Sequence, residues 1–179
     1  IQHIAKPILR GEADIVVPKR DEEMFKKTYP FYQYESEVEG NRTYNEELKS
    51  HKLIDVGGND LDMFFGPRAL SNDRKVVSLF MKSYHFSAAH ASFPKWYFDA
   101  EELSNTNFFP IVAALRKGFK VKSIKVPFKY PNMQKQNEEA LDNFFLEKRK
   151  AQRIGLIVEL LHFVAYLEKY RRIRVKALR

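Results

Sequence analysis

Two pairs of charged residues have the types and spacing that could bind a phosphorylated or metal-bound ligand. The first pair, Lys19 and Arg20, follows the β-branched run at residues 15–17, which predicts a strand buried on both faces. Ligands of open α/β sheets bind at the carboxyl ends of strands, so this basic pair could meet a phosphate there. The alternative interpretation is that both side chains are solvated at the surface.

The second pair, Asp60 and Asp62, forms an Asp-x-Asp sequence that leads into Gly66 and Arg68. Alternate side chains of an extended segment point the same way. Carboxylate oxygens suit Mg²⁺ or Mn²⁺, so the pair could bind a metal ion and a diphosphate. It could instead bind an acceptor molecule together with Gly66 and Arg68, or lie in a solvated loop shaped by Asx turns.

Two further side chains are candidates for ligand contact. Arg68 could contact an anionic acceptor or pair with Asp62 or Asp73. Trp96 begins an aromatic run that could stack on a sugar ring or anchor a loop. The sequence contains no phosphate-cradling glycine loop, no His-Glu-x-x-His and no Ser-His-Asp arrangement.

The composition predicts a folded domain with anionic partners. The 179 residues are 44% hydrophobic and carry a net charge of +8. This length supports a substantial core, and the charge favours nucleotide phosphates, nucleic acid or acidic lipid headgroups. The absence of cysteine excludes disulfides, zinc–thiolate sites and thiol nucleophiles, and it permits a reducing compartment. We expect a cytoplasmic protein that could associate with a membrane surface.

The elements that must position these residues predict an α/β fold, in which helices flank a mixed sheet. Strands are expected at residues 15–17, ending at Pro18, and at 53–56 and 119–128. The last strand should contain a bulge, because its apolar positions change parity. It should also lie at an edge of the sheet, because three lysines interrupt it.

Helices should cover this sheet, and their ends carry capping residues and glycine. A helix that begins at N-cap residues 104–107 should run through residue 117 and end at Gly118. The other expected helices are a segment at 4–9, a short turn at 21–27, a polar helix at 31–50 interrupted near Gly40, and a short helix at 74–81.

A long amphipathic helix is expected from residue 138 through residue 172, after a domain at 1–137. It could pack on its own domain, pair with another subunit in a homo-oligomer, or lie on an anionic membrane with the basic tail at 169–179. Its apolar run is too short to span a bilayer. No nucleic-acid-binding motif accompanies the basic residues, so nucleic acid is not the expected partner.

Several motifs in order resemble family 2-like glycosyltransferases of the GT-A fold, over most of residues 1–153. The pattern G-x-A-D-I-V-V-P-K-R at residues 11–20 is similar to the segment after the metal-binding Asp-x-Asp of that family. The sequence F-G-P-R-A-L at 65–70 looks like its acceptor-side segment. The late helix, glycine and strand resemble L-R-K-G-F-K-V-x-x-I-x-V-P at 115–127, and Tyr130-Pro131 looks like the segment that follows.

The resemblance implies transfer of a sugar from a nucleotide-sugar donor to an acceptor hydroxyl. In such a reaction, a divalent cation, Mg²⁺ or Mn²⁺, stabilises the departing diphosphate and a carboxylate takes the acceptor proton. The resemblance places the family's Asp-x-Asp and its nucleotide-binding strands before residue 1, so we expect that N-terminal half to be missing here. Asn107 stands where the family carries its catalytic carboxylate pair, and Glu101 or Glu102 could substitute. Tyr130 stands where the family often has a metal-binding histidine.

The sequence thus predicts a glycosyltransferase, or a fragment of one, whose partners are a nucleotide-sugar and an acceptor. Its expected acceptor-binding residues are Asp60, Asp62, Gly66, Arg68 and Trp96. The alternative function is a non-catalytic basic module that engages a membrane surface or nucleic acid through its C-terminal helix.

Overall fold

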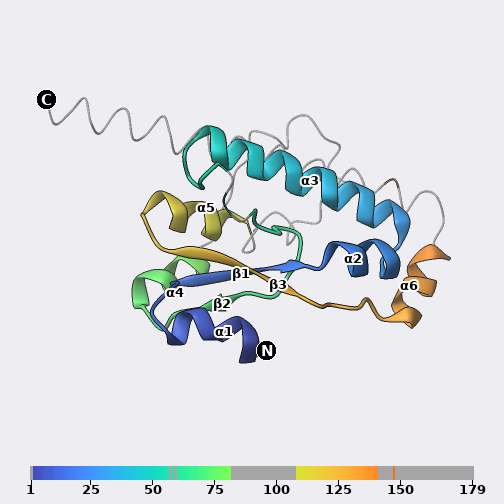
Figure 1. Cartoon of the computed structure of the whole chain (residues 1–179), viewed down its shortest axis with the longest axis horizontal. Helices are drawn as coiled ribbons and strands as arrows, with labels where there is room; N and C mark the ends of the chain where they lie inside the picture. Colours follow the sequence, from blue (N-terminus) through green and yellow to red (C-terminus); the bar gives the residue numbers. More distant parts are fainter. Residues whose placement is uncertain (1, 57, 59, 82–107, 141–146, 148–179) are drawn as a thin grey trace, which may run out of the picture.

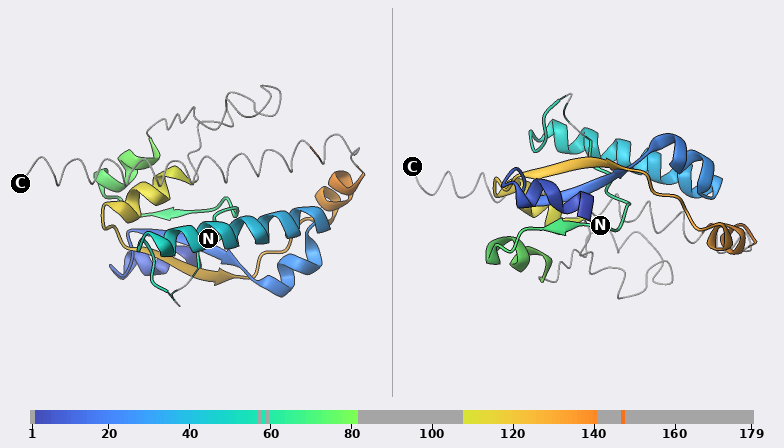
Figure 2. Two further views of the ribbon diagram at one scale, coloured as in Figure 1. Left: turned by 90° about the horizontal axis from the view of Figure 1, so that it is seen from above. Right: turned by 60° about the horizontal axis from the view of Figure 1, so that its bottom comes forward.

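The computed structural model shows a mixed α/β fold, as the sequence predicts (Figure 1). The structure describes residues 2–56, 58, 60–81, 108–140 and 147. Among these, the long helix α3 (Phe31–Ser50) lies on one side of a small sheet and α1 (Gln2–Leu9) lies on the other (Figures 1 and 2). In the described part of the chain, no helix is long and apolar enough to cross a membrane.

The sheet has β1 (Ile15–Arg20) between two other described strands. The short strand β2 (Ala69–Leu70) runs antiparallel to β1, and β3 (Val121–Val126) runs parallel to it. Because β3 has one described neighbour, its lysine-rich sequence lies at an edge, as expected. Its pairing with β1 is unbroken from Val121 to Val126, so the expected bulge is wrong. The strand β2 was not predicted.

The β-branched run of β1 is buried on both faces, as the sequence predicts. Ile15, Val16 and Val17 are fully buried. Ile15 and Val17 belong to the core shared with α3, whereas Val16 alternates to the other face, where α1 contacts β1. A strand that is buried on both faces favours apolar residues at every position, which explains why three β-branched residues follow one another here.

The strand does not stop at Pro18 but continues to Arg20. Proline cannot donate a backbone hydrogen bond, so a central strand tolerates it only where one side is unpaired. The strand β2 pairs only with Ile15 and Val16. Among the described residues, one side of β1 is therefore free of ladder bonds at Pro18. This allows Arg20 to remain in register opposite Val126.

Helix α3 is continuous, so the interruption expected near Gly40 is wrong. A glycine inside a helix costs only about 1 kcal/mol relative to alanine. Packing of the helix against the sheet offsets that cost, because Tyr44 and Leu48 are fully buried in the core. Gly40 itself is buried, in the middle of this packed helix.

The main core joins α3 and the sheet to α4 (Arg74–Phe80) and α5 (Phe109–Arg116). Val76 and Leu79 of α4 are fully buried in it. The helix α5 begins after Phe108, later than predicted, and residues 104–107 lie outside the described residues. Gly118 follows α5 with a φ of +78°, which confirms it as the glycine that ends this helix.

Residues 53–56 form turns and no strand, contrary to the prediction. Leu53 and Ile54 nevertheless pack against the main core from this irregular segment. Their apolar side chains are therefore explained by burial without a hydrogen-bonded ladder. This shows why a short apolar run does not by itself identify a strand.

A second, smaller cluster lies beyond the carboxyl end of β1. It consists of Phe25, Tyr29 and Tyr130, and it joins the expected short helix α2 (Glu22–Thr28) to the segment after β3. The helix α6 (Asn132–Glu139) follows and is capped at Ala140, so a long helix does not begin at residue 138 as predicted. Apart from residue 147, the rest of the predicted C-terminal helix and the basic tail lie outside the described residues.

Candidate functional site

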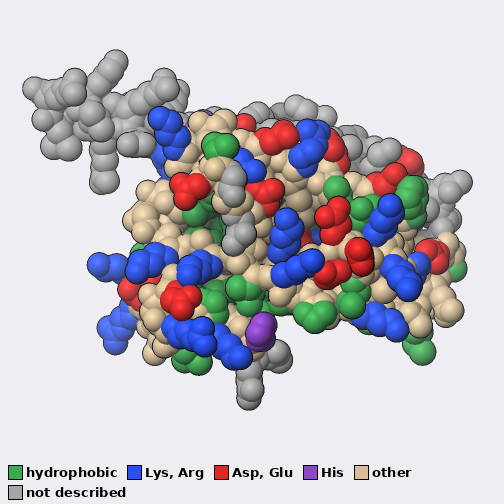
Figure 3. Space-filling view, in the orientation of Figure 1, with side chains coloured by type: hydrophobic (Ala, Val, Ile, Leu, Met, Phe, Trp, Pro, Cys, Tyr) green, Lys and Arg blue, Asp and Glu red, His purple; other side chains and the backbone are tan. Residues whose placement is uncertain are grey.

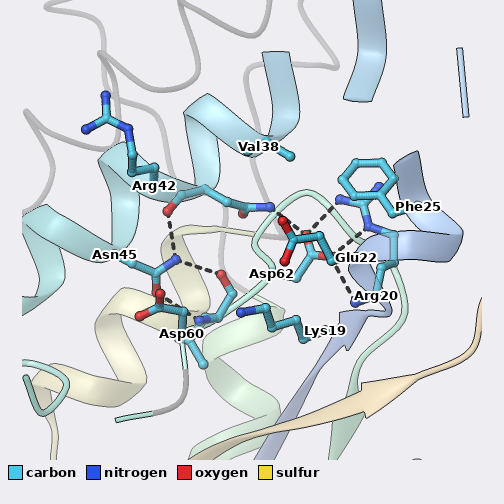
Figure 4. A pocket seen from close by; sticks show the side chains of 11 residues that line it. Lys19, Arg20, Glu22, Phe25, Val38, Arg42, Asn45, Asp60 and Asp62 are labelled. Carbon is cyan, nitrogen blue, oxygen red and sulfur yellow. Dashed lines mark hydrogen bonds and ion pairs between the residues drawn. The ribbon is translucent and has the colours of Figure 1, made fainter. Parts of the chain in front are cut away.

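A pocket of about 290 Å³ opens at the carboxyl end of β1, between this strand and α3 (Figure 4). A neighbouring pocket of about 300 Å³ reaches the carboxyl end of β3. The two pockets share Lys19, Arg20, Glu22 and Asp60, so we describe them together as the β1 pocket. Its place agrees with the rule that ligands of α/β sheets bind outside the carboxyl ends of parallel strands.

Arg20 lies beneath this pocket and is not a surface residue. Only 3% of it is exposed. Its Nε and a terminal nitrogen donate to the two oxygens of Asp62 at 2.7 and 2.8 Å, and its other terminal nitrogen donates to Glu37 at 2.7 Å. Arg20, Asp62 and Glu37 form what we call the buried ion cluster. Each of its three guanidinium nitrogens donates to a carboxylate, so the positive charge of Arg20 is paired within the protein.

Aromatic rings surround the guanidinium of Arg20. Its central carbon lies 3.6 Å from the ring centroid of Phe25, 5.0 Å from that of Tyr29 and 5.5 Å from that of Phe65. Such contacts stabilise a desolvated cation. They also connect the buried ion cluster to the aromatic cluster of α2, so the end of β1 is held from two sides.

The charges of the cluster stabilise one another despite burial. Burial alone raises the pKa of Asp62, but the hydrogen bonds and positive charge of Arg20, with the amide of Asn41, hold it below its usual value. Burial likewise lowers the pKa of Arg20, but Asp62 and Glu37 outweigh this effect and raise it. Asp62 and Arg20 are therefore charged at neutral pH, and their buried charges are paired rather than isolated.

Two asparagines of α3 hold the segment at residues 60–63 against the helix. Asn45 donates to the Leu61 carbonyl at 2.9 Å and accepts from the Leu61 N–H at 2.8 Å. Asn41 donates to Asp62 and accepts from the Met63 N–H, both at 2.8 Å. These side chains replace the backbone partners that the irregular segment lacks, because buried polar groups need partners.

The two aspartates of the Asp-x-Asp sequence have different roles. Asp62 is buried and all its bonds are made to Arg20 and Asn41, whereas Asp60 is half-exposed at the pocket and pairs with Lys49 at 2.6 Å. In the described ranges, no group of three or more histidine or acidic side chains could hold a metal ion. The two carboxylates thus pair with different cations, Arg20 and Lys49.

Arg68 is turned toward the backbone of its own loop. It donates to the carbonyl oxygens of Met63 and Pro67 at 2.9 and 2.8 Å, and also to that of Phe65. Burial lowers its pKa to about 10, partly offset by the charge of Asp62. It forms no ion pair with Asp62 or Asp73, both of which are described. Gly66 lies in this loop, and a Cβ atom added there would meet no other atom within 4 Å.

Charged groups of both signs are intermingled on this face of the molecule, over α2 and α3 (Figure 3). Lys19 and Glu22 are exposed at the β1 pocket and make no ion pair with any described residue. Lys125 is also at the pocket but pairs with Asp21 at 2.8 Å. Of the predicted phosphate-binding pair, the structure therefore brings only Lys19 to the pocket surface.

Several predicted site residues cannot be placed. Glu101, Glu102, Asn107 and Trp96 lie outside the described residues. Conversely, sequence reasoning missed the polar residues of α3 that build the site. Gln33, Glu37, Asn41 and Asn45 recur every four residues, which places them on one helix face. That spacing within the predicted polar helix is the signal that could have found them.

Comparisons of the chain with protein-family models, with curated proteins and with solved structures give no match.

Proposed function

We propose that this chain is the acceptor-side part of a GT-A-like glycosyltransferase, which transfers a sugar from a nucleotide-sugar to an acceptor hydroxyl. The observation that supports the proposal is the position of the β1 pocket. It lies at the carboxyl ends of the parallel strands β1 and β3 in a mixed α/β sheet, next to the exposed carboxylate of Glu22. The other support is the ordered set of motifs that resembles this family over most of residues 1–153.

In this proposal, the described residues bind the acceptor and do not hold the cation. A divalent cation would supply stabilisation of the departing diphosphate. Asp62 of the Asp-x-Asp sequence does not fit it, because both oxygens of its carboxylate accept hydrogen bonds from Arg20 and Asn41. We therefore derive no step through a cation. The proposed proton acceptors, Glu101 or Glu102, come from the resemblance and lie outside the described residues.

Calorimetry tests the proposal. The full-length protein is titrated with UDP- and GDP-sugars in the presence of Mn²⁺. We expect one donor to bind and Glu101→Gln or Glu102→Gln to lower the transfer rate without weakening that binding. Failure of every donor to bind would overturn the proposal.

The alternative, a basic module that binds membranes, depends on residues 169–179, which lie outside the described residues. No observation of the structure favours it. Sedimentation with anionic liposomes, with and without this tail, distinguishes the two functions, since tail-dependent binding without donor binding would support the module.

A further inference from the structure

We propose that the β1 pocket binds an uncharged, hydroxyl-rich ligand such as a sugar ring, through Lys19, Glu22 and Ser123. This deepens the proposed function by naming the class of acceptor, and as a statement about an acceptor it rests on that function. The binding itself stands on the geometry of the pocket.

The first argument is the balance of charge in the pocket. Lys125 forms an ion pair with Asp21 at 2.8 Å, and Asp60 forms one with Lys49 at 2.6 Å. The guanidinium of Arg42, at the outer wall, donates to Glu39 and to Glu46. In the buried ion cluster, Arg20 forms ion pairs with both Glu37 and Asp62.

Two charged lining groups make no ion pair or hydrogen bond with any described residue. They are Lys19, with one positive charge, and Glu22, with one negative charge. A hydroxyl group can accept a hydrogen bond from an ammonium and donate one to a carboxylate. A ligand with several neutral hydroxyls therefore matches both groups, whereas a simple anion matches only one.

The second argument is the hydroxyl of Ser123, which also lines the pocket. Ser123 is 9% exposed, and its Oγ has no hydrogen-bond partner in the described part of the structure. In the parallel pairing, Ser123 lies opposite Val17, and Lys125 lies opposite Lys19. These side chains share one face of the sheet, because alternate residues of a strand point the same way.

An unsatisfied buried hydroxyl is unfavourable, so a ligand that supplies a partner for Ser123 gains affinity. Phe25 and Val38 line the other of the two joined pockets, where their apolar surface can contact the C–H groups of a sugar ring. The two joined pockets, of about 290 and 300 Å³, are each near the lower end for small-molecule pockets, so each suits one ring rather than an extended chain.

A phosphate group fits these observations less well. It would bring its negative charge close to Glu22 and Asp60, with Lys19 as the only lining cation that lacks an ion pair among the described residues. The first free N–H groups of α2 offer little compensation, because Asp21 already caps this helix by accepting from Met24 at 3.0 Å. Like charges at close range oppose binding.

The experiment is a titration of the isotope-labelled protein followed by NMR, without any donor. The probes are methyl α-D-mannopyranoside, methyl β-D-glucopyranoside and methyl β-D-galactopyranoside at millimolar concentrations, with inorganic pyrophosphate as the anionic probe. We expect at least one glycoside to shift the amide signals of Lys19, Glu22 and Ser123. Pyrophosphate should leave these signals in place.

Matched variants identify the groups that bind. Glu22→Gln and Lys19→Gln should each weaken glycoside binding by about tenfold, the effect of one hydrogen bond to a charged group. The controls Glu23→Gln and Lys26→Gln, which change exposed neighbours on α2 outside the pocket, should not.

Two results would overturn the proposal: pyrophosphate shifting these signals while the glycosides do not, or no glycoside shifting them. Since no donor is present, a glycoside that binds here supports the pocket even if glycosyl transfer is disproved. Conversely, if the protein transfers a sugar but no glycoside shifts the amide signals of the β1 pocket, the proposed function stands and this binding site is refuted.

Discussion

Replacing Arg20 with methionine removes the cation of the buried ion cluster and keeps much of its apolar bulk. The change deletes three charge-assisted hydrogen bonds of 2.7 to 2.8 Å and leaves Asp62 and Glu37 buried without their counter-ion. Removing one partner of a buried ion pair costs about 3–5 kcal/mol. We therefore expect Arg20→Met to lower the free energy of unfolding by about that amount at pH 7.

An independent estimate gives a similar figure. A buried carboxylate that has lost its partner can become neutral by taking up a proton. For an aspartate with an ordinary pKa of about 3.9, protonation at pH 7 costs about 1.4 kcal/mol for each of roughly three pH units, or about 4 kcal/mol. Because Asp62 can take up a proton instead of remaining charged, the loss of stability caused by Asp62 cannot exceed about 4 kcal/mol at pH 7.

The control is Arg42→Met on the exposed face of α3. Arg42 also bridges two carboxylates, Glu39 and Glu46, but its side chain is 57% exposed. Exposed ion pairs contribute about 0–1 kcal/mol, so the control should change stability by no more than that. Urea unfolding followed by circular dichroism measures both variants.

The pH dependence tests the cause. In the natural protein the pKa of Asp62 is lowered, so its stabilising effect is present above the unfolded value, about 3.9, and is lost as pH falls below it. In Arg20→Met, burial alone should raise that pKa, so the variant loses stability as pH rises above the unfolded value.

The stability gap between the two proteins should therefore be widest near neutral pH and should narrow toward pH 4. A gap below about 1 kcal/mol at pH 7, or one that is constant over this range, would refute a paired buried cluster. If Arg20→Met does not fold at pH 7, refolding at pH 4 provides the same test.

Two further changes test local backbone features by urea unfolding. Gly118→Ala should destabilise the fold by about 1–2 kcal/mol, because Gly118 has a φ of +78°; Gly66→Ala, in open space and not at positive φ, should change it by less than about 0.5 kcal/mol. Asp21→Ala should cost about 1 kcal/mol through loss of the helix cap to Met24, whereas Asp21→Asn should retain it. Equal effects within either pair would contradict the assigned cause.

The features that the sequence predicts correctly are encoded over a few neighbouring residues. Three β-branched residues in a row predict β1, and the short helical turn expected at 21–27 corresponds to α2. Gly118 predicts the end of α5 because a single backbone conformation decides it. Each of these features depends on residues that are close together in the sequence, so it can be predicted without knowledge of the tertiary structure.

The errors occur where packing at a distance decides the outcome. Residues 53–56 look like a strand because they are apolar, but Leu53 and Ile54 reach the core from a turn. Gly40 looks like a helix break, yet burial of the surrounding turns of α3 outweighs its low propensity. In both cases, tertiary contacts and not the local sequence pattern decide which secondary structure forms.

The basic pair at the end of β1 shows how such a contact changes the chemistry of a site. Lys19 and Arg20 are adjacent and both line the β1 pocket, but Lys19 is exposed whereas only 3% of Arg20 is exposed. Arg20 is matched by Glu37 and Asp62, which lie 17 and 42 residues further along the chain. Of this basic pair, only Lys19 is exposed at the pocket, where Glu22 also lies. Among the described residues, the pocket then has one charge of each sign that forms no ion pair, and for this reason we propose a hydroxyl-bearing ligand rather than a phosphate.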